Sequence, residues 1–369
     1  MLRQKKRKKI RLKAQVSRLD FWLAIAVFLL VCFGVLMVYD ASAVVAFRDF
    51  RDKYYFLKLQ SLWALVGFFI LFFLSLFDYH RFFSLSPFLF LFTVFLLALV
   101  FAPGFSIKAY GARRWLNLRF FVLQPSELSK LTLVLYLSAW LSKKRSLLGF
   151  LVTVLTVLFL ILLGKDLGTA LVVLGISLAL YFLSGAPLSH FFLILPPAVL
   201  GFLILILKTP YRLRRVMTFF NPTLDPLGAS YHVRQVLIAL GSGGLFGLGI
   251  GKSRQKYAYL PESFTDSIFA IISEEIGFIG ALAIILLYLF IFWRGLKIAK
   301  DAPDFFGQLL GGGIICWLAL QTFINLASMV VLVPLTGLPL PFVSYGGSNL
   351  LVSLAGMGIL LNISRKARE

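Results

Sequence analysis

Apolar runs long enough to cross a lipid bilayer recur along the whole of this 369-residue chain. A helix needs about 20 apolar residues to span the hydrocarbon core, where only helices and closed barrels satisfy their own backbone polar groups. The sequence is 60% hydrophobic and only 14% charged, a composition that excludes an ordinary soluble domain. We therefore expect an all-α polytopic integral membrane protein.

We expect ten transmembrane helices, with one long extracytoplasmic loop between helices 7 and 8. The expected spans cover residues 21–43, 56–77, 82–103, 122–141, 147–164, 168–184, 189–207, 267–293, 308–333 and 348–364. The chain then divides into a basic cytoplasmic tail (1–20), a ten-helix membrane domain (21–364) that contains the long loop (208–266), and a C-terminal tail (365–369). Within the loop, residues 231–240 predict a short helix ahead of a flexible glycine-rich stretch.

The net charge of +22 raises nucleic acid as a partner, but membrane topology and anionic lipid account for it in so apolar a chain. We therefore expect no nucleic-acid partner. Nine Lys and Arg residues lie within the first 18 positions. Because Lys and Arg are retained on the cytoplasmic side, the N-terminus is expected in the cytoplasm, and an even number of spans returns the C-terminus there.

The expected outer loops are also basic. The long loop carries eight cations against three carboxylates, namely Lys208, Arg212, Arg214, Arg215, Arg234, Lys252, Arg254 and Lys256 against Asp225, Glu262 and Asp266. The preceding outer loop adds Lys108, Arg113, Arg114 and Arg119. A cationic outer vestibule favours an anionic partner such as a lipid phosphate or pyrophosphate. Contact with anionic lipid headgroups is the alternative for each of these residues.

Asp266 is the most informative single residue, because it lies where the polar loop runs into a fully apolar helix. A carboxylate at a membrane border is only partly hydrated, and such groups are candidates for function. With an unperturbed pKa of about 3.9, it is expected to be ionised and able to act as a base. Glu262, one turn earlier if the segment is helical, is a reserve base.

Further charges interrupt apolar sequence and leave two interpretations open. Glu127 and Lys130 stand three residues apart on one helical face, where they form either a structural ion pair or part of a site. Asp166 either caps the following helix or belongs to a site at the outer mouth. Glu274 and Glu275 are interpreted as structural, with at least one of them needing a neighbouring cation.

The stretch Pro334–Gly347 contains three prolines that break any helix. It is either a tight outer turn or one wall of a substrate cavity, since irregular backbone at membrane depth survives only where it is buried in protein or lines a wet cavity. His80, His190 and His232 have no metal-ligand spacing and are interpreted as structural, so no metal site is assigned to the protein itself.

Five blocks of sequence resemble the SEDS (shape, elongation, division and sporulation) family of membrane proteins over nearly the whole chain. They are MVYDASAV with YYFLKLQ, GARRWLNL with QPSELSK, DLGTA, the long run from Tyr231 to Gly280, and NLASMVVLVPLTGLPLPFVSYGG. The wording of the long run from Tyr231 to Gly280, together with the opening block, is most similar to the division and sporulation members, and less to the elongation member. The chain departs from the family pattern at Asp40, Lys165, Phe264 and Ser267.

The resemblance implies a ten-helix peptidoglycan glycosyltransferase that polymerises lipid II at the outer face of the bacterial cytoplasmic membrane, for septal wall synthesis. It implies that Asp266 is the essential carboxylate. The substrate-binding residues that we expect are Glu127, Lys130, Asp166, Arg212, Arg215, Glu262, Lys252 and Gly346. It also implies a class B penicillin-binding protein as partner, together with other membrane proteins of the division or elongation complex.

In the expected reaction, Asp266 takes the proton from the acceptor hydroxyl as that oxygen attacks the anomeric carbon of the donor. Because a lipid pyrophosphate leaves, cations rather than a second carboxylic acid are needed, either from Arg and Lys or from Mg²⁺ or Mn²⁺ held chiefly by substrate phosphates. Two other classes stay open. A lipid II flippase would use the same polar cavity and broken helices, and a scaffold for division partners would use neither.

Overall fold

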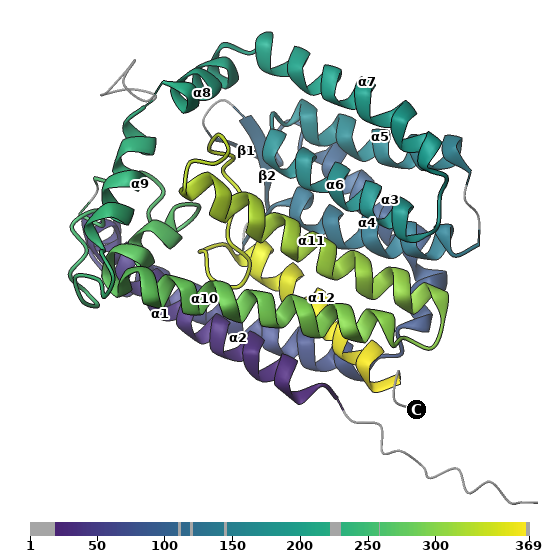
Figure 1. Cartoon of the computed structure of the whole chain (residues 1–369), viewed down its shortest axis with the longest axis horizontal. Coiled ribbons are helices and arrows are strands. Elements are labelled where there is room, and N and C mark those ends of the chain that lie inside the picture. Colours follow the sequence, from purple (N-terminus) through teal and green to yellow (C-terminus); the bar gives the residue numbers. More distant parts are fainter. Residues whose placement is uncertain are drawn as a thin grey trace, which may run out of the picture.

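The computed structural model describes residues 19–109, 112–118, 121–143, 146–221, 230–257 and 259–366. Within these ranges the chain is mostly helical (Figure 1). The helices are α1 (Phe21–Phe50), α2 (Tyr55–Leu76), α3 (His80–Leu99), α4 (Pro125–Leu141), α5 (Leu147–Leu163), α6 (Leu167–Leu183), α7 (Leu188–Leu207), α8 (Pro210–Phe220), α9 (Tyr231–Ser242), α10 (Ile268–Lys300), α11 (Phe305–Met329) and α12 (Gly347–Lys366).

Seven of these helices are long and apolar enough to cross a membrane: α1, α2, α3, α7, α10, α11 and α12. Two shorter apolar helices, α5 and α6, lie between them in the sequence. Large apolar side chains cover the outside of the bundle, for example Phe69, Phe88 and Phe192. Exposure of so wide an apolar surface to water is unfavourable, whereas lipid would cover it. The protein is therefore a multi-pass membrane protein.

The expected helix positions are largely confirmed, but several ends differ. Each of the ten expected spans overlaps one helix, and α1 and α10 run seven residues beyond their expected ends at 43 and 293. The short loop helix is confirmed as α9. The structure adds α8, an amphipathic helix that begins with Pro210 at its first turn, a position that suits proline because its missing N–H needs no partner there.

The expectation of an all-α fold is wrong in one place. A small antiparallel sheet, ordered β1-β2-β3, lies between α3 and α4 and is built from Ser106–Ala109, Ala112–Asn117 and Val122–Leu123. The expected spans 82–103 and 122–141 both extended toward it. The helical pattern stops earlier because Pro103 and Gly104, the latter with φ +88°, turn the chain.

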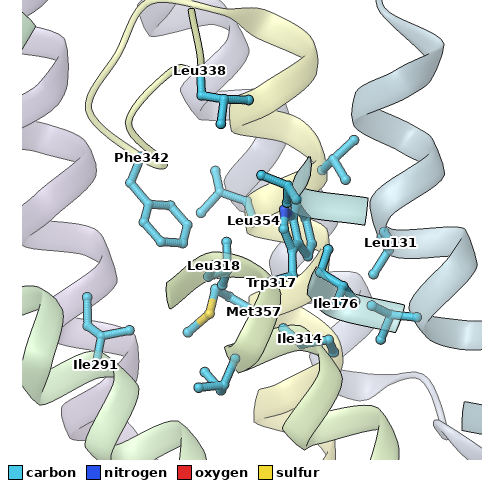
Figure 2. Close-up of a cluster of buried hydrophobic side chains, with 14 of the residues drawn as sticks. Leu131, Ile176, Ile291, Ile314, Trp317, Leu318, Leu338, Phe342, Leu354 and Met357 are labelled. Carbon is cyan, nitrogen blue, oxygen red and sulfur yellow. The ribbon is translucent and has the colours of Figure 1, made fainter. Parts of the chain in front are cut away.

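The core lies where α4, α6, α11 and α12 meet. Figure 2 shows the indole of Trp317 among Leu131, Ile176 and Ile314, and Trp317 is fully buried. In contrast, Ile194 is the single buried residue of α7, and Figure 1 places α7 along one edge of the bundle. The interior polar groups described below are thus carried by the central helices, away from that edge.

The segment 330–346 has no regular helix and folds back into the bundle. Leu340, Phe342 and Ser344 are buried, and Leu338 and Phe342 lie against the apolar core (Figure 2). A Cβ atom placed on Gly34 of α1 would lie 2.6 Å from the carbonyl oxygen of Phe342, so the segment packs directly on that helix. This burial contradicts a tight outer turn and favours the alternative, one wall of a cavity.

The long helix α10 is broken at Gly277, where φ is 68° and ψ is −172°, a backbone conformation open essentially to glycine alone. The loop that follows α9 fills the break. Backbone hydrogen bonds join Leu248 N to Glu274 O and Gly249 N to Glu275 O, each at 3.0 Å. A Cβ atom on Gly247 would lie 2.1 Å from Glu275 O. The loop and the first part of α10 therefore form one interlocked unit.

Candidate functional site

Asp266 lies on the turn immediately before α10 and faces the segment 330–346. A Cβ atom on Gly337 would lie 3.3 Å from Asp266 Oδ2. The side-chain amide of Asn325 donates to the carbonyl oxygens of Asp266 (2.9 Å) and Leu338 (2.7 Å). Asn325 on α11 thus holds the turn against the segment 330–346. This role was not predicted from the sequence, although a polar side chain within an apolar span indicates a possible function.

The turn is held in shape from two sides. The carbonyl of Glu262, a residue with φ 51°, accepts from Thr265 N (3.2 Å) and Ser267 N (3.1 Å). From the segment 330–346, the hydroxyl of Ser344 donates to Thr265 O (2.6 Å), and Tyr345 N donates to Phe264 O (2.9 Å). Because both neighbours of Asp266 are hydrogen-bonded through their backbone, its carboxylate is presented in a fixed position.

Burial raises the pKa of the Asp266 carboxyl to about 7, and the nearby charge of Glu262 raises it further, whereas Arg215 opposes the shift. The charge of Asp166 also raises the pKa of Asp266, by a smaller amount, and the charge of Arg114 lowers it. Part of the side-chain surface remains open, yet the surrounding atoms exclude most of the water. The upward shift agrees in direction with the partial hydration expected of a carboxylate at a membrane border, and the use of Asp266 as a base stays a prediction.

Two arginines, Arg215 of α8 and Arg114 of β2, act electrostatically on Asp266, and Arg212 of α8 interacts in the same way with Arg114 and Asp166. Arg215 Nη1 donates to Leu335 O (3.0 Å), which fixes the guanidinium against the segment 330–346. Burial lowers the pKa of Arg212, as does the charge of Arg114, while Asp166 opposes them. The sequence indicates Arg114 only as one of several expected outer cations, without a place in the site.

Arg114 and Asp166 line a small pocket of about 260 Å³, measured with its open mouth. Arg114 is held by the carbonyl oxygens of Gly164 (3.2 Å) and Lys165 (2.6 Å). Asp166 caps α6 by accepting from Thr169 N (3.1 Å) and the Thr169 hydroxyl (2.9 Å). The capping interpretation is confirmed, and the same carboxylate also faces the pocket, so the two interpretations of Asp166 are compatible.

Glu127 and Lys130 form the expected ion pair deep in the bundle. Lys130 Nζ lies 2.8 Å from both Glu127 carboxylate oxygens and 2.6 Å from Gln321 Oε1, and both charged side chains are buried. Gln321 Nε2 in turn donates to Pro339 O (2.9 Å) and Asn349 Oδ1 (3.1 Å). All three ammonium hydrogens have acceptors, so the pair supports the segment 330–346 from inside; substrate contact by these two residues stays a prediction.

The remaining expected site residues are Glu262, Lys252 and Gly346. Glu262 is exposed and accepts from the Thr265 hydroxyl (2.7 Å). Lys252 is exposed on the loop after α9. Gly346 precedes α12, and its N–H donates to Gln60 Oε1 (3.4 Å). Their roles in binding stay predictions.

His232 of α9 lies beside the start of α10. His232 Nε2 lies 2.7 Å from the Ser267 hydroxyl, and burial, with the charge of Arg215, lowers the pKa of His232 to about 4. It is therefore a neutral partner that joins α9 to the start of α10, as its structural interpretation predicts. Across the described ranges, no three His, Cys, Asp or Glu side chains gather into a metal-binding group.

Comparison with known proteins places this site in a family context. Residues 21–369 match the FtsW/RodA/SpoVE family model, described as "Cell cycle protein". "Stage V sporulation protein E" of Bacillus subtilis (strain 168) is 42% identical over 357 residues, which cover 95% of this chain and 98% of the relative. "Probable peptidoglycan glycosyltransferase FtsW" of Geobacter sp. (strain M18) is 40% identical over 362 residues, covering 96% of this chain and 99% of the relative.

Two solved structures share the fold. A chain from "Structural coordination of polymerization and crosslinking by a peptidoglycan synthase complex" superposes with a TM-score of 0.78 at 30% identity, covering 95% of this chain and 98% of the other. The "Rod shape determining protein RodA" of Thermus thermophilus gives a TM-score of 0.69 at 29% identity, covering 94% and 97%. The sequence match and the fold agree, and the chain belongs to the FtsW/RodA/SpoVE family, the SEDS membrane proteins.

Proposed function

We propose that this chain is a peptidoglycan glycosyltransferase that polymerises lipid II at the outer face of the bacterial cytoplasmic membrane. The observation that supports this most is Asp266, a carboxylate with a pKa near 7, fixed beside a buried wall of irregular backbone and a group of arginines. A general base works best when its pKa lies close to the ambient pH. The relative from Geobacter is itself named a probable peptidoglycan glycosyltransferase.

In the proposed reaction, ionised Asp266 accepts the proton of the acceptor sugar's 4-hydroxyl. The new bond forms between that oxygen and the anomeric carbon of the donor, and the bond from this carbon to the lipid pyrophosphate breaks. The electron pair leaves with the pyrophosphate, whose charge Arg215, Arg212 and Arg114 stabilise. A divalent ion carried by the substrate phosphates would add to this stabilisation.

The proposal includes the placement of the chain in the membrane. Ten helices, α1–α7 and α10–α12, cross the bilayer, and both termini lie in the cytoplasm because the first 18 residues carry nine cations. The segment with α8 and α9 and the turn of Asp266 then lies outside. A class B penicillin-binding protein would crosslink the product, in septal wall synthesis or in the related sporulation role that the Bacillus relative's name indicates.

The test is polymerisation of fluorescent lipid II by the detergent-purified protein, with and without a class B penicillin-binding protein. We expect glycan from the wild type and at least about a hundredfold less from Asp266→Asn, in line with the loss of a general base. Asp301→Asn, at an exposed position, is the matched control and should keep full activity.

Two results would contradict the proposal in different ways. If the wild type makes no glycan but moves lipid II across liposomes, the protein is a flippase. If Asp266→Asn is folded by gel filtration and polymerises at the wild-type rate, the glycosyltransferase stands and Asp266 is not its base.

A further inference from the structure

A buried lysine ties together three parts of the chain next to the site. Lys256 is 5% exposed. Its Nζ donates to both carboxylate oxygens of Asp40 on α1 (2.8 and 3.0 Å) and to Glu275 Oε1 on α10 (3.1 Å). Burial alone would lower the pKa of Lys256, but the hydrogen bonds to these two carboxylates raise it above its ordinary value. The ammonium group is therefore engaged inside the protein and is not one of the free outer cations that its sequence position suggested.

The two adjacent carboxylates of α10 both bind the loop that carries Lys256. Glu275 accepts from the backbone N–H groups of Gly251 (3.1 Å) and Ser253 (3.0 Å). Glu274 accepts from three further groups of the same loop, namely the Ser253 hydroxyl and the N–H groups of Arg254 (3.1 Å) and Gln255 (3.4 Å). The expectation that one of these glutamates needs a cation is confirmed by Lys256, and both carboxylates have a structural role.

From this loop the chain runs directly to the turn of Asp266, and it is fastened along the way. Leu260 N donates to Gln255 O (3.0 Å). The Ser263 hydroxyl donates to the carbonyl of Ala41 (3.4 Å), the residue next to Asp40 on α1. The path to Asp266 is therefore anchored to α1 on both sides of Leu260, once through Lys256 and once through Ser263.

We propose that Lys256 is a positioning residue for Asp266: its ion pairs with Asp40 and Glu275 hold the loop that delivers the carboxylate to the site. This inference rests on the proposed transferase function. Lys256 touches no reacting atom, and it acts by fixing the distance of Asp266 from the wall formed by 330–346. A displacement of about 1 Å in a reacting group can cost about a hundredfold in rate.

The first test compares Lys256→Met and Lys256→Arg with the wild type in lipid II polymerisation. Methionine keeps the volume but leaves Asp40 and Glu275 facing each other without a cation. We expect kcat to fall about tenfold or more while KM changes by less than about threefold, because a mispositioned base weakens the transition state and not ground-state binding. Arginine preserves the ion pairs and should restore kcat to within about threefold. Lys58→Met, which removes an exposed lysine paired with Asp52, is the matched control and should leave kcat unchanged.

Removing one member of a buried ion pair can also prevent folding, so a second variant is needed. Asp40→Asn combined with Lys256→Met removes one of the two uncompensated carboxylates, and the other, Glu275, keeps the N–H groups of Gly251 and Ser253. We expect this double variant to recover the folded yield while kcat stays low. The inference is overturned if kcat per folded molecule equals that of the wild type in either methionine variant, or if Lys256→Arg is as slow as Lys256→Met.

A readout that does not depend on activity separates this inference from the proposed function. Hydrogen exchange of the backbone amides of residues 259–268 should become about tenfold faster in the double variant, while α5 and α6 keep the wild-type rate. Unchanged exchange in 259–268 overturns the positioning role even if the protein polymerises lipid II. If the wild type is silent in polymerisation but the exchange accelerates, the proposed function fails and the positioning of Asp266 by Lys256 is upheld.

Discussion

Replacement of Asp266 by asparagine is predicted to make the protein more stable, and increasingly so as the pH rises. The folded protein raises the pKa of this carboxyl to about 7, mainly through burial, whereas an unfolded chain has the ordinary value of about 3.8. A group with a raised pKa contributes stability fully below pH 3.8, and this contribution is lost as the pH rises through 7. Asparagine keeps the shape of the neutral acid and carries no charge, so it escapes this loss.

The two pKa values fix the size of the effect. Relative to a pH below 3.8, the Asp266 carboxyl lowers the free energy of unfolding by up to about 4 kcal/mol at pH 8 and by between about 1 and 2 kcal/mol at pH 5. The advantage of Asp266→Asn should therefore grow by about 2–3 kcal/mol between pH 5 and pH 8, an upper bound because part of the side chain remains open to the surface. In thermal unfolding this amounts to a few degrees.

Thermal unfolding of the detergent-purified protein, followed by intrinsic fluorescence at pH 5, 6, 7 and 8, measures this directly. Asp301→Asn controls for loss of an exposed carboxylate and should show no growing advantage. A constant difference between Asp266→Asn and the wild type across this pH range would refute the desolvated state of Asp266, as would a wild type that gains stability relative to the variant at pH 8.

Two other predictions concern the rate and the fold. The polymerisation rate should fall about tenfold per pH unit below pH 7, because ionised Asp266 is the active form. The Glu262→Gln variant should show this fall at lower pH, since the charge of Glu262 raises the pKa of Asp266. A rate that is flat from pH 5.5 to 7 would contradict the base assignment. Gly277→Ala should destabilise the protein by about 2–5 kcal/mol in thermal unfolding, because the new Cβ atom would lie 2.3 Å from Gly247 N and φ is 68°. The control Gly201→Ala places its Cβ atom where nothing lies within 4 Å and should leave the stability unchanged. Equal unfolding temperatures for the two variants would show that the break in α10 tolerates a side chain.

The sequence was sufficient to predict the helices and the position of Asp266, because both follow from local patterns. Long apolar runs define spans, and a lone carboxylate at the end of such a run stands out without knowledge of the fold. The i, i+3 spacing of Glu127 and Lys130 likewise predicted their ion pair. The small sheet was missed since its strands are two to six residues long and carry no apolar run of their own.

Contacts between distant parts of the chain could not be predicted from local patterns. The pairing of Lys256 with Asp40 joins residues 216 positions apart, and the contact of Asn325 with Asp266 joins residues 59 apart. The raised pKa of Asp266 depends on the same packing, because its largest cause is burial. Spacing rules describe one helix or one turn, whereas these groups meet only when several helices assemble.

The segment 330–346 has a consequence for how the protein is made. Asp266 emerges from the ribosome about 65 residues before this segment does, as the numbering of the chain requires. Until Ser344 and Tyr345 reach the backbone of Thr265 and Phe264, the turn of Asp266 lacks its hydrogen bonds from this segment. A nascent chain that ends before the segment 330–346 thus carries the carboxylate of the candidate site without the backbone that lies beside it, so this site can be assembled only late in synthesis.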